Sequence, residues 1–167
     1  MPTFDLVILG GGSGGYAAAL RGAQLGLSVA LIEKDKLGGT CLHYGCIPTK
    51  ALLHAAEVAD AAKEAGAFGI KAAFEGVDLP GVYSYRDGVV GRLYKGLQGL
   101  VKSRSVELVE GTGRLTSPTT VQVGDETYTA SKAVVLATGS YARSLPGLEI
   151  GGRVITSYEA LTLDYVP

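Results

Sequence analysis

The chain has 167 residues, of which 47% are hydrophobic and 19% charged, which is the balance of a globular domain with a real core. The formal net charge of −1 gives no electrostatic footprint for nucleic acid or for an anionic membrane, and no apolar run approaches the roughly 20 residues of a membrane span. The N-terminus lacks the pattern of a secretion signal. We therefore expect a cytoplasmic protein, in which a disulfide would more often be catalytic than structural.

The first elements form a dinucleotide-binding pattern. Residues 4–9 are a short apolar run, typical of a buried parallel strand, and they lead directly into the sequence GGGSGG at residues 10–15. A helix of small residues is predicted over 16–25, and a second strand over 28–32 ends at Glu33. This combination of strand, glycines, helix, strand and acid predicts a dinucleotide site.

Each glycine of the G-x-G-x-x-G pattern has a distinct expected role. Gly10 makes the tight turn, Gly12 lets the backbone approach a pyrophosphate, and Gly15 lets the helix pack closely. Glu33 is placed to bind a ribose hydroxyl. The pattern alone does not separate FAD from NAD, and a glycine-rich loop without a ligand is the simpler alternative.

The only two cysteines, Cys41 and Cys46, lie in the sequence GGTCLHYGCIPTK at residues 38–50. Five residues along a regular helix separate Cα atoms by roughly 8–9 Å, so a bonded pair requires a loop, a turn or a distorted helix. We expect the regular helix to begin near Pro48 and to continue towards Gly66. Cys46 would then lie at the helix N-terminus, where the N–H groups and the nearby Lys50 favour a thiolate.

Two other interpretations of the cysteines remain open on spacing alone. Both could be reduced, buried and inert, because cysteine is among the most buried residue types. Zinc could bind with His43 or His54, but His54 lies about 12 Å of helix beyond Cys46, which argues against a local four-ligand site.

The rest of the chain predicts further parts of an α/β domain. Residues 77–102 have the spacing of an amphipathic helix that begins after Asp78 or Pro80. Residues 106–110 predict a third parallel strand. Short runs at 114–116, 120–123 and 127–130 predict a small antiparallel β-meander inserted in the domain. Residues 133–137 predict another buried strand, and 157–161 a capped single helical turn. The predicted fold is a Rossmann-like α/β domain with a parallel sheet.

Four segments, taken in order, resemble the class I pyridine nucleotide-disulfide oxidoreductases. They are the glycine pattern with Glu33, residues 38–50, the sequence ATGS at 137–140 and the sequence LPG at 145–147. Within that family the sequence of residues 38–50 is most similar to that of the dihydrolipoamide dehydrogenases, although His43 and Tyr44 stand where other residues are frequent.

The resemblance implies an FAD-binding domain with a redox-active disulfide. Cys46 would be the sulfur against the flavin, Cys41 the interchange thiol that attacks the substrate disulfide, and Lys50 would lie beside the isoalloxazine ring. No metal is implied. The cofactor-binding residues implied are Gly10, Gly12, Ser13, Gly14, Gly15, Glu33, Lys34, Gly39, Thr40, Lys50, Gly113, Ala137, Thr138, Gly139 and Ser140.

The implied reaction converts dihydrolipoamide and NAD⁺ to lipoamide and NADH, with electrons passing through the Cys41–Cys46 pair and FAD. The implied partners are the 2-oxo acid dehydrogenase complexes and a second subunit of a homodimer. Family members are longer, so we expect residues 1–147 to be part of the FAD-binding domain and 148–167 a connector towards an NAD-binding domain.

The same resemblance leaves the chain incomplete for turnover by itself. The family's His–Glu acid–base pair is not matched by His43 or His54. A non-catalytic FAD-binding module is one alternative, and a sister reductase of the glutathione or mercuric type is another.

Overall fold

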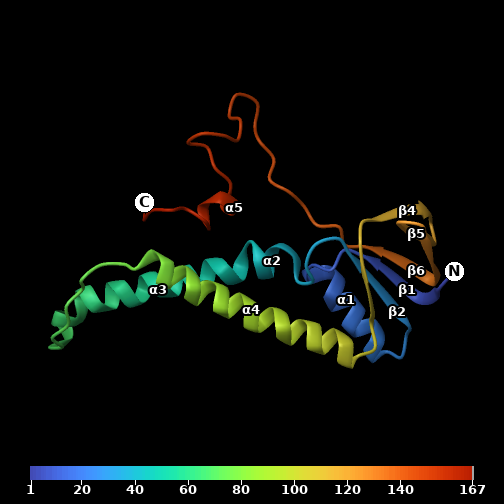
Figure 1. Ribbon diagram of the computed structural model, residues 1–167, viewed down its shortest axis with the longest axis horizontal. Helices are drawn as coiled ribbons and strands as arrows, with labels where there is room; N and C mark the ends of the chain where they lie inside the picture. The colour runs from blue at the N-terminus through green and yellow to red at the C-terminus, as the bar shows by residue number, and fades with distance from the viewer. Residues whose placement is uncertain (167) are drawn as a thin grey trace. The chain divides into compact units, whose positions relative to one another are not determined.

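A computed structural model describes residues 1–166, which form two compact units. The sheet unit comprises Met1–Cys41 and Leu93–Tyr141, and the helical unit comprises Leu42–Arg92 and the residues from Ala142 onward. Figure 1 shows the elements of both. The domain boundary expected at residue 147 stays a prediction.

The sheet unit is built on one six-stranded sheet with the order β3-β2-β1-β6-β5-β4. β1 pairs in parallel with both β2 and β6, and β2 pairs in parallel with β3. β5 pairs antiparallel with β4 and β6. The α/β fold with an antiparallel meander is thus confirmed. The strands are β1 (Thr3–Leu9), β2 (Val29–Glu33), β3 (Glu107–Glu110), β4 (Gly113–Ser117), β5 (Thr120–Val123) and β6 (Glu126–Leu136).

Alternate side chains of β1 lie on opposite faces of the sheet, as the two-residue period of a strand requires. Val7 and Ile8 are both fully buried, and they belong to different clusters. Side chains of the meander join the cluster around Val7. The cluster around Ile8 contains residues of α1 (Ser13–Gln24) and of the C-terminal part of α4 (Leu79–Ser103), where Val101 is buried (Figure 1). Both faces of the central strand are therefore covered.

β6 corrects one expectation from the sequence. The runs at 127–130 and 133–137 are not two strands but one continuous strand. Its first residues pair antiparallel with β5, and the rest pairs in parallel with β1. The register shifts where Ser131 and Lys132 stand opposite Asp5, which forms a bulge. The meander is therefore continuous with the parallel sheet.

The carboxylate of Asp5 joins β1 to the residue before β2 and to the bulge of β6. Its Oδ2 accepts hydrogen bonds from the N–H and the hydroxyl of Ser28 at 2.9 and 3.0 Å, and the Asp5 N–H donates to Ser28 Oγ at 2.8 Å. Its Oδ1 lies 3.1 Å from Lys132 Nζ and 3.4 Å from Ser131 Oγ. The backbone hydrogen bond from Ser28, followed by Lys132, lowers the pKa of Asp5 to about 2.

The helical unit contains α3 (Cys46–Glu64), which begins two residues earlier than expected from Pro48. The short helix α2 (Gly39–His43) precedes it, and a 3₁₀ turn, η1 (Ala65–Phe68), follows it. Proline is tolerated in the first turn because the N–H groups there have no partner within the helix. In the described part of the chain, no helix is long and apolar enough to cross a membrane.

The last helix, α5 (Ser157–Ala160), begins with a capping box. Thr156 Oγ1 accepts a hydrogen bond from the Tyr158 N–H at 3.2 Å, and Glu159 Oε2 accepts one from the Thr156 N–H at 2.8 Å. The side chain of Thr156 also bonds the same carboxylate, and this bond lowers the pKa of Glu159. The capped helical turn predicted over 157–161 is confirmed.

Asp5→Asn should reduce the stability of the fold at neutral pH, and the stability of this variant should then fall less steeply than that of the wild type as the pH is lowered. Because the pKa in the folded state lies below the unfolded value, the carboxylate stabilises the fold above about pH 4, and this contribution is lost as the pH falls towards 2. Thermal unfolding midpoints from pH 7 to pH 2 measure the effect. Asp125→Asn, in an exposed turn, is the control. Parallel curves for wild type and Asp5→Asn would contradict the assignment.

Candidate functional site

Two glycines of the loop between β1 and α1 are required by close backbone packing. Gly10 has φ of +105°, and a Cβ atom there would lie 2.2 Å from the carbonyl oxygen of Ala137 at the end of β6. A Cβ atom at Gly15 would lie 1.7 Å from the carbonyl oxygen of Gly10. No side chain can be accommodated at either position without movement of the backbone. These two glycines therefore bring the loop, β6 and α1 together.

Gly12 has a different environment. Its φ is −71°, which any residue can adopt, and the nearest atom to a Cβ there would be Gly39 Cα at 3.8 Å, an ordinary contact. Gly12 is the N-cap of α1, and no side chain among the described residues caps this helix. Ser13 and Gly14, next in the chain, are exposed. The backbone at Gly12 thus leaves an accessible helix N-terminus, which favours an anion.

The backbone of Gly11 links the loop to two other segments. Its N–H donates to Glu33 Oε2 at 2.6 Å, and its carbonyl accepts from the Gly38 N–H at 2.8 Å. The other oxygen of Glu33 accepts from the Asp35 N–H at 2.9 Å. Sequence reasoning gave Glu33 a role towards a ribose only and gave Gly11 none, because Gly11 is a variable position of the pattern. The structure shows that Glu33 also holds the loop.

The structure brings several other predicted residues of the sheet unit to this loop. Gly39 has φ of +59°, and a Cβ atom there would lie 2.7 Å from Gly12 Cα. Ala137 donates its N–H to the Leu9 carbonyl at 2.8 Å, directly beside Gly10. Five further predicted cofactor-binding residues near these segments are exposed. They are Lys34, Thr40, Thr138, Gly139 and Ser140.

Gly113 has a clear packing reason to be a glycine. A Cβ atom there would lie 2.5 Å from Leu9 Cδ1 and 3.0 Å from Ile32 Cγ2. It is therefore enclosed by apolar side chains of β1 and β2. Its contact with a cofactor stays a prediction.

The cysteine segment contains the helix break that the spacing required. Cys41 is half-buried in α2, and Cys46 is exposed as the first residue of α3. The two helices are separated by Tyr44 and Gly45, whose φ and ψ are −150° and −105°. The pairing of the two cysteines stays a prediction.

The first turn of α3 is secured by Thr49. Its N–H and its hydroxyl both donate to the Gly45 carbonyl, at 3.0 and 2.6 Å. Lys50 is exposed one turn after Cys46. His54, considered above as a zinc ligand, instead faces Glu57 at 3.2 Å. Among residues 1–166 no group of three or more His, Cys, Asp or Glu side chains could hold a metal ion.

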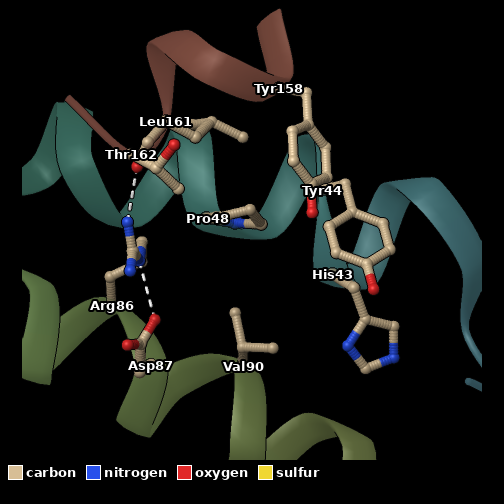
Figure 2. Close-up of a pocket in the computed structure, with 9 residues that line it drawn as sticks. All are labelled: His43, Tyr44, Pro48, Arg86, Asp87, Val90, Tyr158, Leu161 and Thr162. Carbon is tan, nitrogen blue, oxygen red and sulfur yellow. Dashed lines mark hydrogen bonds and ion pairs between the residues drawn. The ribbon is translucent and has the colours of Figure 1, made fainter.

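The helical unit contains a pocket of about 140 Å³ that sequence reasoning missed (Figure 2). Tyr44 and Tyr158 form one side of it, with ring centroids 5.1 Å apart. Arg86 lies at the opposite side, where its Nη1 donates to the Leu161 carbonyl at 2.5 Å and its Nε to Asp87 at 2.7 Å. The pocket joins residues over 70 positions apart, which no local pattern reveals.

Comparisons with known proteins identify the family. Residues 4–167 match the family described as pyridine nucleotide-disulphide oxidoreductase. Over 98% of its length the chain is 46% identical to a dihydrolipoyl dehydrogenase of Bacillus subtilis and 48% identical to one of Thermus scotoductus, of which it covers 37% and 35%. It is also 44% identical, again over 98% of its length, to a leghemoglobin reductase of Vigna unguiculata, of which it covers 32%. The chain thus spans about a third of the length of these relatives, and it belongs to the pyridine nucleotide-disulphide oxidoreductase family.

Proposed function

We propose that the chain binds FAD and carries the redox-active cysteine pair of a dihydrolipoyl dehydrogenase. The observation that carries this proposal is the contrast within the glycine loop. At Gly10 and Gly15 the neighbouring backbone leaves no room for a Cβ atom, whereas Gly12 has room for one and lies at an uncapped helix N-terminus. Packing explains the first two glycines but not the third. A pyrophosphate bound at this terminus would explain it.

The residues present fit FAD as the dinucleotide. The N–H groups of the first turn of α1 would face the phosphates, and Glu33 at the end of β2 would face the adenosine ribose. Small residues at the end of β6, Thr138 to Ser140, would leave room for the cofactor. When bound, FAD would accept an electron pair from the cysteines and deliver it to NAD⁺.

The cysteines would perform thiol–disulfide exchange with the substrate. One thiolate of dihydrolipoamide attacks Cys41 Sγ of the oxidised pair, the Cys41–Cys46 bond breaks, and Cys46 leaves as a thiolate. The second thiolate of the substrate then attacks the mixed disulfide, which releases cyclic lipoamide and the Cys41 thiolate. Two electrons have moved from the substrate to the pair. The exposure of Cys46 and the half-burial of Cys41 are compatible with these roles.

In the proposed scheme the complete reaction also uses an NAD⁺ site and an acid–base pair. NAD⁺ would bind in a domain beyond the proposed connector at 148–167, and the acid–base pair would come from a partner subunit of a homodimer. Assembly into 2-oxo acid dehydrogenase complexes and a cytoplasmic location complete the proposal.

Gly12→Ala and Gly15→Ala should separate cofactor binding from folding. The Gly12 variant should retain most of its stability, because its Cβ makes only ordinary contact, but should lose FAD affinity by tenfold or more. The Gly15 variant should be destabilised by at least about 3 kcal/mol, since its Cβ meets a carbonyl oxygen. Thermal unfolding and flavin-fluorescence titration measure the two effects. Unchanged FAD affinity in Gly12→Ala would contradict the site.

Anaerobic reduction of the chain with bound FAD tests the cysteine roles. Addition of two electrons should produce a long-wavelength absorption band, which arises from the Cys46 thiolate beside the flavin. Cys46→Ser should abolish this band. Cys41→Ser is the matched control: without a disulfide to reduce, it should show the band before any reductant is added, because the Cys46 thiolate already lies beside oxidised flavin, and it should lose the band as two electrons reduce the flavin. Flavin that bleaches without the band would favour a cofactor-binding module with no redox pair.

A further inference from the structure

The segment between the two cysteines contacts a residue more than 100 positions later in the chain. Within the helical unit, the half-buried ring of Tyr44 packs against the ring of Tyr158, with centroids 5.1 Å apart and planes inclined by 43° (Figure 2). Tyr158 is the second residue of α5. Tyr44 lies three residues after Cys41 and two before Cys46. A contact to Tyr44 therefore restrains the chain between the thiols.

The segment that carries Tyr158 is itself anchored on α4. Arg86 Nη1 donates to the Leu161 carbonyl at 2.5 Å, and the Tyr83 hydroxyl donates to the Leu163 carbonyl. The Arg86 guanidinium lies 4.2 Å from the centroid of the Tyr83 ring. Only 12% of the Arg86 side chain is exposed. Two adjacent side chains of one helix turn thus fix the backbone that follows α5. The chain is therefore fixed three and five residues after Tyr158.

The other end of the segment between the cysteines is also fixed. The Gly45 carbonyl accepts both the N–H and the hydroxyl of Thr49. Gly45 is thereby attached to α3, while Tyr44 is attached to α5. Neighbouring residues of a non-helical turn are held from two directions by groups distant from each other in sequence. This arrangement has no explanation in the binding of a dinucleotide.

We propose that Tyr158 is a positioning residue for the Cys41–Cys46 pair: its contact with Tyr44 pre-orders the turn and favours closure of the disulfide. The inference rests on the proposed function, since it assumes that the two thiols form a redox pair. Closing a ring costs the conformational entropy of the residues within it. Contacts that already order those residues reduce this cost. The dithiol therefore oxidises more completely than it would with a mobile turn.

The closure is measured as an exchange with glutathione. The Cys41 and Cys46 thiols together lose two electrons and two protons as their S–S bond forms. One molecule of oxidised glutathione takes up both and is reduced to two thiols. The chain is equilibrated without oxygen in buffers of varied glutathione ratio, quenched with a maleimide and weighed by mass spectrometry. The fraction labelled at both cysteines gives the equilibrium constant.

Tyr158→Ala should lower the equilibrium constant for disulfide formation about three- to tenfold, which is the range expected for loss of an aromatic pair. A tenfold decrease corresponds to about 30 mV in the reduction potential of the pair. Tyr158→Phe keeps the ring and should match wild type. Tyr165→Ala removes a ring of similar exposure, 58% against 53%, in the same segment, and should also match.

A double-mutant cycle distinguishes loss of the Tyr44–Tyr158 contact from local unfolding in the Tyr158→Ala variant. Tyr44→Ala and the Tyr44→Ala/Tyr158→Ala double variant are measured in the same buffers. If the contact acts as proposed, Tyr158→Ala changes the constant little once Tyr44 is alanine. Equal effects of Tyr158→Ala in both backgrounds would overturn the inference, as would a wild-type constant in the single variant. Wild-type chain that forms no Cys41–Cys46 bond at any ratio would overturn the proposed function as well.

Discussion

The two hydrogen bonds of the Gly11 backbone are the constraint on which the candidate site depends. One joins the glycine loop to Glu33 at the end of β2, and the other joins it to Gly38, three residues before Cys41. The backbone of one residue thus connects the glycine loop, the Glu33 carboxylate and the start of the cysteine segment. In the proposed site the same Glu33 carboxylate also binds the ribose, so a change at Glu33 should alter loop shape and ribose binding together.

The glycines of the fingerprint have unequal physical reasons to be glycines. Two of them allow backbone atoms to approach within distances that exclude any Cβ, and these approaches connect β1, β6 and α1. The third has ordinary space around it. A sequence pattern treats the three alike, because it records identity and not surroundings. The surroundings in the folded chain separate the glycines that build the loop from the one that leaves it accessible.

Local periodicity was sufficient to predict most elements, including both long helices and the parallel strands. Local periodicity failed where polar residues that interrupt an apolar run make contacts with a distant part of the chain. Ser131 and Lys132 divide β6 in the sequence, but they form a bulge opposite Asp5 in one continuous strand. The pairing of Tyr44 with Tyr158 and the anchoring by Arg86 were equally invisible, since such contacts depend on chain topology.

The place of β6 in the sheet has a consequence for how the chain folds. β1 is made first, yet one of its two neighbours is formed by residues 126–136. Until those residues join, β1 has an unpaired edge, and the meander has no strand on which to assemble. Such pairing between distant segments raises the contact order, which slows folding. During synthesis, the open edge of β1 is therefore a place where the growing chain can pair with another chain.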